Sequence, residues 1–344
     1  MKFSEKILVT GGTGYIGSHT CVVLIERGIE PVIVDNLSNS NPVVLDRIER
    51  ITKHRPAFHQ VDVRDAGALK RLFRENKFDA VIHFAGLKSV RESAQKPREY
   101  HLNNVEGSRT VVDAMQSADV KRIIFSSSAT VYGAPDSVPT PETAPLRPVN
   151  PYGETKVAIE KMLQAAHDAD PSWRIGILRY FNPVGAHELG LIGEDPKGVP
   201  ENLMPFIAQV AAGRYPYLRV FGNDYPTPDG TGIRDYIHVM DLANGHVAAL
   251  SYQSNREGLF TVNLGTGQGY SVLEVVKAFE KASKRHIPYQ IMARRPGDIA
   301  ACFADVRKSR QLLRWHAQYG LEQMCADAWR WQSANPYGYD RAPS

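Results

Sequence analysis

The 344-residue sequence has few cysteines and no segment long and apolar enough to cross a bilayer. Its three cysteines are Cys21, Cys302 and Cys325, and no two of them stand at the spacing of metal ligands. This usage is typical of a reducing compartment. Because the N-terminal segment also lacks the apolar core of a signal peptide, we expect a soluble cytoplasmic protein without a metal site.

The sequence also lacks a dense run of charge of one sign. Its formal net charge is +4, and the basic residues are spread along the chain. This pattern favours a solvated surface over a nucleic-acid partner, and it leaves some basic residues for an anionic substrate. With 43% hydrophobic and 23% charged residues, the composition is that of a globular protein large enough for two domains.

A glycine-rich turn stands between a short apolar run and a helical segment near the N-terminus. Its glycines are spaced three residues apart, at Gly11, Gly14 and Gly17. Glycine lets the backbone turn tightly and approach a pyrophosphate, and the start of the following helix offers free N–H groups to it. This order of strand, turn and helix predicts a dinucleotide-binding site.

Asp35 closes the second apolar run, 18 residues after Gly17 (35 minus 17). An acidic residue in this place accepts hydrogen bonds from the adenosine ribose and repels a 2′-phosphate, so NAD is favoured over NADP. The three-residue glycine spacing is typical of the short-chain dehydrogenase/reductase superfamily. The alternative is a glycine-rich turn in an ordinary α/β protein, which the flanking strands and Asp35 disfavour.

Strand-like and helix-like segments alternate through the first half of the chain, which predicts an α/β fold with a doubly wound parallel sheet of the Rossmann type. We expect strands at residues 7–9, 31–34, 57–61, 80–84, 122–125 and 174–178, and helices at 18–27, 66–76, 100–115 and 152–167. We assign residues 1–182 to an NAD-binding domain. Residues 183–344 form a smaller α/β substrate domain, some segments of which rejoin the first domain.

Polar residues follow the ends of these predicted strands. They are Asp35, Asp62, Lys88, Ser128 and Asn182. Because ligands of such sheets bind beyond the carboxyl ends of the strands, we expect these residues to outline one cleft.

Tyr152 and Lys156 stand four residues apart, one turn along the same face of a predicted helix. A free phenol has a pKa of about 10, which a nearby ammonium lowers. Ser128 can hydrogen-bond the same substrate hydroxyl, so this set can move a proton while a nicotinamide takes a hydride. Such pairs also occur by chance on helix surfaces, but the nucleotide fold and the strand-end serine favour the catalytic interpretation.

Longer segments of the chain resemble the UDP-glucose 4-epimerases, a family of the extended short-chain dehydrogenases/reductases. The matching segments are residues 83–88, 126–133, 179–187, 202–205, 221–225, 234–242 and 294–298. They follow the family's order over nearly the whole chain, and this makes them more specific than the glycine motif.

The resemblance implies two sets of binding residues. Those that would line the NAD site are Gly11, Gly14, Tyr15, Ile16, Gly17, Asp35, Asn36, Leu37, Ser38, Asn39, Ser40, Asp62, Val63, Phe84, Ala85, Gly86, Leu87, Lys88, Asn103, Tyr180 and Phe181. Those that would meet the UDP-sugar are Ser128, Tyr152, Asn182, Asn202, Leu203, Arg219, Val220, Phe221, Arg234, Arg295, Asp298 and Cys302. Arg234 and Arg295 would pair with the diphosphate, which guanidinium groups suit by charge and geometry.

The resemblance further implies an NAD-dependent interconversion of UDP-glucose and UDP-galactose through a 4-keto sugar. Tyr152 would move the proton of the 4-hydroxyl with help from Ser128, and Lys156 would position the cofactor ribose. The position of Cys302 lines the sugar pocket in this family, and some members carry a tyrosine there. A cysteine leaves room for the N-acetyl group of UDP-N-acetylglucosamine and UDP-N-acetylgalactosamine, unless Cys302 is simply a small buried residue.

Two other functions are compatible with this type of fold. A nucleotide-sugar 4,6-dehydratase usually carries an acidic pair after the catalytic serine or threonine, where this chain has Ala129 and Thr130. A non-catalytic NAD-sensing protein would be expected to have lost Tyr152 and Lys156. The resemblance also implies a homodimer built from helices around residues 97–117 and 152–167, although apolar faces there could equally pack within one chain.

Overall fold

The computed structural model describes residues 3–254, 256–295 and 297–339. A seven-stranded sheet lies at its centre, in the order β11-β6-β5-β4-β1-β2-β3, and every pairing in it is parallel. The strands are β1 (Lys6–Thr10), β2 (Glu30–Asp35), β3 (Ala57–Gln60), β4 (Ala80–His83), β5 (Arg122–Ser128), β6 (Arg174–Tyr180) and β11 (Gly258–Leu264). The predicted α/β fold with a doubly wound parallel sheet is confirmed.

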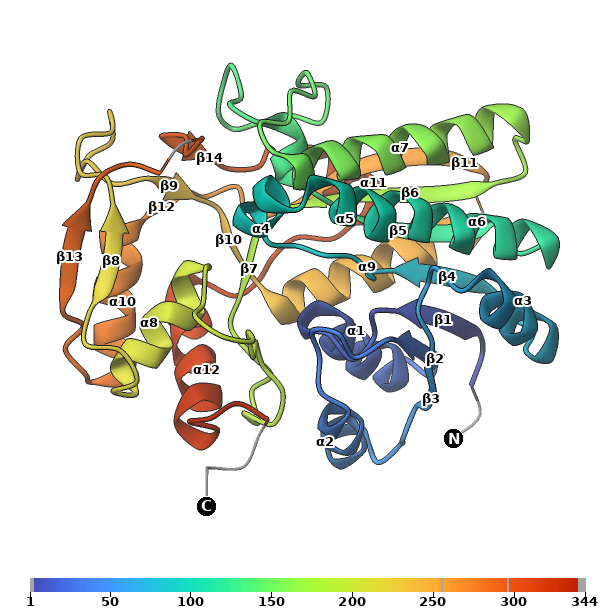
Figure 1. The fold of residues 1–344 in the computed structure, drawn as a ribbon, viewed down its shortest axis with the longest axis horizontal. Coiled ribbons are helices and arrows are strands. Elements are labelled where there is room, and N and C mark those ends of the chain that lie inside the picture. Colours follow the sequence, from blue (N-terminus) through green and yellow to red (C-terminus); the bar gives the residue numbers. More distant parts are fainter. Residues whose placement is uncertain (1–2, 255, 296, 340–344) are drawn as a thin grey trace.

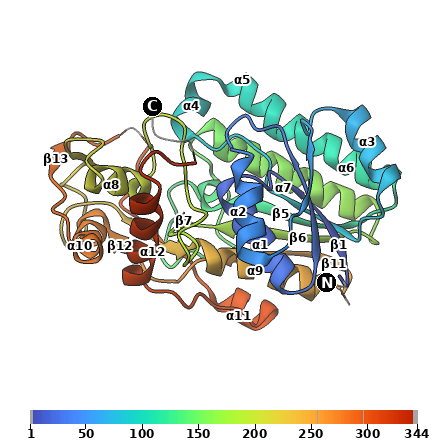
Figure 2. The ribbon, with the colours of Figure 1, turned by 90° about the horizontal axis from the view of Figure 1, so that it is seen from below.

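Helices cover both faces of this sheet (Figures 1 and 2). Ile7 and Val9 of β1 face one apolar layer and Leu8 faces the other, because successive side chains of a strand point to opposite faces. The first layer contains α1 (Tyr15–Glu26), α2 (Val43–Thr52), α9 (Val239–Gln253) and α11 (Arg307–Leu313). The second contains α3 (Ala66–Glu75), α6 (Gly107–Ser117) and α7 (Pro151–Ala169). Burial on both faces explains why the inner strands β1, β2 and β4 are nearly continuous apolar runs, whereas the edge strand β3 is partly exposed.

A smaller group of elements lies beside the carboxyl edge of the sheet, at the left of Figure 1. Ile207, Phe279 and Met324 are fully or almost fully buried in its core. Its larger elements are α8 (Leu203–Ala211), β8 (Leu218–Phe221), α10 (Val272–Ser283), β13 (Tyr289–Met292) and α12 (Leu321–Ala334). Short strands connect it to the sheet: β7 (Asn182–Val184), β9 (Ile233–Arg234), β10 (Tyr236–His238), β12 (Tyr270–Ser271) and β14 (Ala301–Cys302).

The central sheet draws on both halves of the chain. β11 pairs with β6, and α9 packs against α1. Both β11 and α9 follow residue 182 in the sequence, whereas β6 and α1 precede it. The division into domains at residue 182 stays a prediction.

Three local assignments differ from the sequence-based expectation. The helix expected at residues 100–115 consists of α5 (Pro97–Tyr100), a π-helix η1 (His101–Glu106) and α6. The short helix α4 (Val90–Gln95) and α2 were not expected. β5 extends through Ser128 because its three serines pair in register with β6, and the 3₁₀ turn η2 (Ala129–Tyr132) follows.

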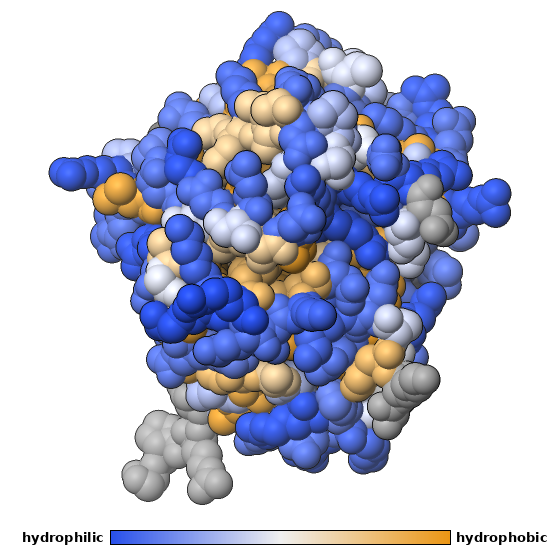
Figure 3. Space-filling view, turned by 90° about the vertical axis from the view of Figure 1, so that its right-hand side faces the viewer, coloured by the Kyte–Doolittle hydropathy of each residue, from blue (hydrophilic) through white to orange (hydrophobic). Residues whose placement is uncertain are grey.

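The face of the molecule in Figure 3 is mostly hydrophilic, and hydrophobic residues show there mainly in hollows and small groups. Within the described parts of the chain, no helix combines the length and apolar composition needed to span a membrane. The same residues contain no group of three or more His, Cys, Asp or Glu side chains that could hold a metal ion.

Candidate active site

The glycine turn lies between β1 and α1, at the carboxyl edge of the sheet. Gly11 has a φ of +70°, and a Cβ there would lie 2.8 Å from the backbone N of Ala85. A Cβ on Gly17 would lie 2.3 Å from the carbonyl oxygen of Gly11. Only glycine fits these positions, so the backbone itself forms the surface above the start of α1. This cradle fits the pyrophosphate of a dinucleotide.

Asp35 ends β2 next to this turn. Its carboxylate accepts hydrogen bonds from the backbone N–H of Leu37 (2.9 Å), the hydroxyl of Ser40 (3.0 Å) and the backbone N–H of Thr13 (3.3 Å). These bonds fold the loop after β2 against the glycine turn. These bonds fix the side chain of Asp35 beside the turn, as the predicted role in binding an adenosine ribose requires.

A second acidic residue lies beside that loop. Asp62 accepts a hydrogen bond from the side chain of Asn36 (3.0 Å) and pairs with Arg64. The hydrogen bonds from Arg64 hold the pKa of Asp62 well below its usual range. The next residue, Val63, is buried in the second apolar layer of the sheet. Asp35, residues 36–40, Asp62 and Val63 are therefore brought together at one end of the predicted NAD site.

The segment after β4 is held by a residue that the sequence analysis missed. Asn104 is 1% exposed, accepts a hydrogen bond from the N–H of Leu87 (2.8 Å) and donates one to the carbonyl of Leu87 (3.0 Å). It also accepts from the side chain of Asn103 (3.0 Å) and donates to Thr155 on α7 (3.1 Å). Asn104 thus ties residues 84–88 to the helix of Tyr152. Its position next to Asn103 on the π-helix was the available signal.

Ser128, Tyr152 and Lys156 lie together at the end of β5, each less than a tenth exposed. The Nζ of Lys156 donates to the carbonyl of Ser126 (2.8 Å) and lies 5.7 Å from the centre of the Tyr152 ring. Ser128 accepts a hydrogen bond from the hydroxyl of Thr130 (3.0 Å). The sequence-predicted catalytic set is therefore assembled in one buried place.

The pKa of Tyr152 differs in direction from the sequence-based expectation. Burial raises it to about 12, although a hydrogen bond with Ser128 lowers it. Burial also lowers the pKa of Lys156 to about 8, although the nearby carboxylate of Glu160 raises it. In this environment the phenol is neutral at neutral pH, because desolvation outweighs the hydrogen bond with Ser128.

The residues predicted to flank the nicotinamide follow β6. Tyr180 ends that strand, and burial raises its pKa, whereas a hydrogen bond with Ser126 lowers it. Phe181 is 6% exposed and packs in an apolar cluster with Val131, Tyr132 and Cys302. At the other end of the site, Tyr15 donates to the carbonyl of Gly185 (2.7 Å), and Ile16 packs into the core.

The predicted uridine-binding residues gather on the smaller group of elements. The guanidinium of Arg295 lies 4.7 Å from the centre of the Phe221 ring and donates to Asp298 (2.9 Å). Arg219 lies 6.0 Å from the same ring. The side chain of Val220 points the other way along β8 and is buried in the core. Pro296, in the predicted segment 294–298, lies outside the described residues.

Cys302 and Arg234 lie opposite each other where β14 pairs with β9. Arg234 donates to the carbonyl of Ile299 (2.9 Å). Cys302 is 6% exposed and packs against the same cluster as Phe181, and burial raises its pKa to about 11. It is a neutral thiol at neutral pH, beside the residue predicted to flank the nicotinamide.

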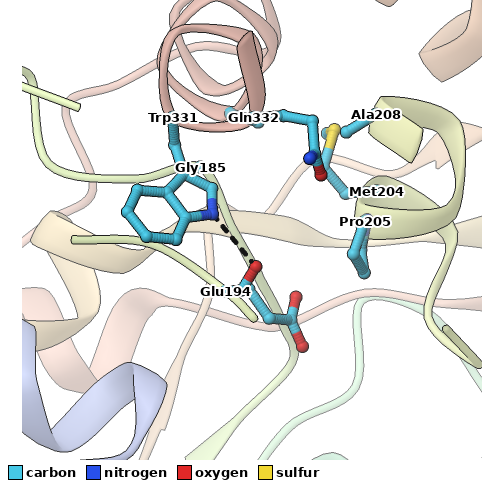
Figure 4. Close-up of a pocket in the computed structure, with 8 residues that line it drawn as sticks. Gly185, Glu194, Met204, Pro205, Ala208, Trp331 and Gln332 are labelled. Atoms are coloured by element: carbon cyan, nitrogen blue, oxygen red, sulfur yellow. Dashed lines mark hydrogen bonds between the residues drawn. The ribbon is translucent and has the colours of Figure 1, made fainter. Parts of the chain in front are cut away.

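Glu194 joins two predicted binding residues that are far apart in sequence. Its carboxylate accepts from the Nζ of Lys88 (3.1 Å) and from the side chain of Asn202 (3.2 Å), which precedes Leu203 at the start of α8. Its backbone carbonyl accepts from the indole of Trp331, beside a small pocket (Figure 4). Asn182 lies at the start of β7, where its N–H donates to the carbonyl of Asp235 (3.0 Å). No local pattern marks Glu194, so the sequence analysis missed it.

Nearly the whole chain is similar in sequence to known nucleotide-sugar enzymes. The family model for GDP-mannose 4,6 dehydratase matches residues 8–328. The chain is 56% identical to UDP-glucose 4-epimerase of Bacillus subtilis over 336 residues, which is 98% of this chain and 99% of that protein.

Solved structures agree with this result. The UDP-glucose 4-epimerase of Bifidobacterium longum, in complex with NAD⁺ and UDP, is similar with a TM-score of 0.94 and 53% identity, covering 97% of this chain and 99% of that one. The UDP-Glc/GlcNAc 4-epimerase of Campylobacter jejuni is similar with a TM-score of 0.84 and 37% identity, covering 96% and 100%.

The parallel sheet, the glycine cradle with Asp35, and the Ser128, Tyr152 and Lys156 set define a nicotinamide-dependent enzyme of the short-chain dehydrogenase/reductase class. The comparisons narrow this class further. The chain belongs to the UDP-glucose 4-epimerase family of the extended short-chain dehydrogenases/reductases.

Proposed function

We propose that the protein interconverts UDP-glucose and UDP-galactose by NAD-dependent 4-epimerisation. The observation that carries this proposal is the buried set of Ser128, Tyr152 and Lys156 at the end of β5, two strands along the sheet from the glycine cradle that follows β1. The names of the relatives and the NAD⁺ and UDP of the Bifidobacterium structure support it.

The glycine cradle and Asp35 would hold NAD, whose nicotinamide ring would supply the exchange of a hydride with carbon 4 of the sugar. Tyr152 accepts the proton of the 4-hydroxyl and later gives it back, with Ser128 holding the same hydroxyl. The positive charge of Lys156 favours the ionised form of Tyr152, which accepts the proton. The 4-keto sugar would turn within the site and present its other face before the hydride came back, so the configuration of carbon 4 would be inverted, and Tyr152 would return the proton to the oxygen on that carbon.

The UDP portion is held by the smaller group of elements. Phe221 offers an aromatic face for the uracil, and Arg295 already lies over that face. Arg234 and Arg295 pair with the diphosphate, because guanidinium groups form bidentate hydrogen bonds with phosphate oxygens. Asp298 accepts from the uridine ribose, and Asn182 and Asn202 bind the sugar diphosphate.

The same site is proposed to accept the N-acetylated sugars of UDP-N-acetylglucosamine and UDP-N-acetylgalactosamine. Cys302 packs beside Phe181, so a small side chain there leaves room near the sugar. The Campylobacter relative is described as a UDP-Glc/GlcNAc 4-epimerase, which supports the wider range.

We also propose a cytoplasmic homodimer. Its three cysteines are free thiols, as in a reducing compartment. Leu102 on η1 and Val90 on α4 are each 44% exposed, beside the helices around residues 97–117 that the family resemblance implicates. Light scattering on the purified protein would measure the mass, and a strict monomer would refute the dimer.

The alternative is a nucleotide-sugar 4,6-dehydratase, the reaction for which the matching family model is named. The turn after Ser128 carries Ala129 and Thr130, and neither is a carboxylic acid that could assist elimination of water. The decisive assay incubates the pure protein with UDP-galactose and no added reductant. Formation of UDP-glucose supports the epimerase, a 4-keto-6-deoxy product supports the dehydratase, and no conversion refutes both.

A further inference from the structure

A buried ion pair lies directly behind the Ser128, Tyr152 and Lys156 set. Glu160 stands one turn after Lys156 on α7, and Arg179 stands on β6. Arg179 donates to both carboxylate oxygens of Glu160, at 2.9 Å and 2.6 Å, and the two side chains are 7% and 6% exposed. The hydroxyl of Ser127 donates to the same carboxylate at 2.5 Å.

This pair connects the elements that carry the site. Ser127 immediately precedes Ser128 on β5, and Arg179 immediately precedes Tyr180 on β6. Arg179 also donates to the hydroxyl of Tyr132 (3.2 Å). Stability alone is a poor explanation, because a buried ion pair is often no more stabilising than well-packed apolar residues of the same volume.

We propose that Glu160 is a positioning residue for the epimerase reaction, because it holds Ser127 and Arg179 to the helix of Lys156 and places a carboxylate near the Lys156 ammonium. This inference rests on the proposed function. Glu160 transfers no proton itself and acts through Ser128 and Lys156.

The groups near Lys156 come from two strands as well as from its own helix. They are Tyr152 and Glu160 on α7, His83 on β4, and the Phe125 ring and the Ser126 carbonyl on β5. On β6, Arg179 pairs with Glu160, and Tyr180 interacts with Tyr152 and Ser126. Burial lowers the pKa of His83 to about 3 and raises the pKa values of the two tyrosines, so these three groups are neutral near pH 7. Glu160 is the carboxylate that raises the pKa of Lys156 against the effect of burial.

Glu160→Gln tests the proposal because it keeps the shape of the side chain and removes its charge. Lys156 should then lose its proton at a lower pH, by about 1–2 pH units for a charge one helical turn away. The midpoint is measured by NMR on protein labelled with ¹³Cε-lysine, with the Lys156 resonance assigned from Lys156→Arg. The alkaline limb of the kcat profile should move to lower pH in parallel.

Two further variants keep the experiment decisive. Glu154→Gln makes the same substitution at an exposed position of α7, and it should leave the midpoint in place. If Glu160→Gln does not fold, Glu160→Gln combined with Arg179→Met removes both charges of the pair, which proteins often tolerate. Because Glu160 is the carboxylate that raises the pKa of Lys156, the midpoint should fall in this double variant too, by a smaller amount since the positive charge of Arg179 is removed as well.

The outcomes separate this inference from the proposed function. If Glu160→Gln lowers the melting temperature and leaves the titration midpoint of Lys156 unchanged, the ion pair is purely structural and the inference is wrong. This result would not affect the proposed function, which depends on the epimerase activity of the wild type. A wild-type protein without epimerase activity would overturn the proposed function, and with it the role of Glu160 in that reaction, whatever the NMR midpoint.

Discussion

Tyr152→Phe removes the hydroxyl that is proposed to move the proton and keeps the buried aromatic ring. The ring is 7% exposed, so its packing is retained. The lost hydrogen bond with Ser128 is worth about 1 kcal/mol, and Ser128 keeps its contact with Thr130. In a protein of this size we expect the melting temperature to change by no more than about 2–4 °C.

The effect on turnover should be far larger. A positioned acid–base group contributes about 10²–10⁴-fold in rate. Burial raises the pKa of Tyr152 from 10 to about 12, so the folded environment adds about 3 kcal/mol to the cost of ionising this phenol. The positive charges of Lys156 and of the bound cofactor would favour the ionised phenol, and neither can act through a phenylalanine. We therefore expect kcat to fall to between about a hundredth and a ten-thousandth of its original value.

The assay measures kcat with UDP-galactose alongside thermal unfolding. Tyr100→Phe is the matched control, because Tyr100 is equally buried and its hydroxyl donates to Glu92 and accepts from Ser89, both at 3.0 Å. The control should lose stability and keep its turnover. A Tyr152→Phe protein that retains more than about a tenth of kcat, well outside the expected range, would remove Tyr152 from the mechanism.

Four further outcomes are expected. Gly17→Ala places a Cβ 2.3 Å from a backbone oxygen, so the purified variant should melt at a lower temperature and release less nucleotide on denaturation. Unchanged values would show that the glycine turn does not bind the nucleotide. The wild type should release NAD or NADH by mass spectrometry, Asp35→Ser should gain affinity for NADP, and recovery of chiefly NADP from the wild type would refute the charge argument. Cys302→Tyr should lose kcat/KM mainly for UDP-N-acetylgalactosamine, and a wild type inactive on that substrate would show that another residue closes the pocket. Burial lowers the pKa values of His19 and His83 from 6.5 to about 3. The free energy of unfolding is therefore highest above pH 6.5, where both residues are neutral, and it declines as the pH falls towards 3, by about 2 kcal/mol for each residue at pH 5. Equal melting temperatures at pH 7.5 and pH 5 would contradict this prediction.

Local sequence patterns identified most of the sheet. Apolar runs buried on both faces appear in the sequence as continuous stretches, so the strands before residue 180 were predicted within a few residues. The glycine spacing was informative because a Cβ at Gly11 or Gly17 would collide with backbone atoms. The helix α4 was missed because six residues carry little periodic signal, whereas α2 was missed although its buried Val44, Leu45 and Ile48 stand at helical spacing.

The sequence by itself determined the order of strand, glycine turn and helix, the acid at the end of β2, and the spacing of Tyr152 and Lys156, because each depends on residues close together in the chain. Tertiary structure alone decided that β11 joins β6, that Glu194 bridges Lys88 and Asn202, and that Glu160 pairs with Arg179 behind the site. It also decided that burial raises the pKa of Tyr152. Contacts between distant segments and the loss of solvent around a side chain arise only when the whole chain has packed.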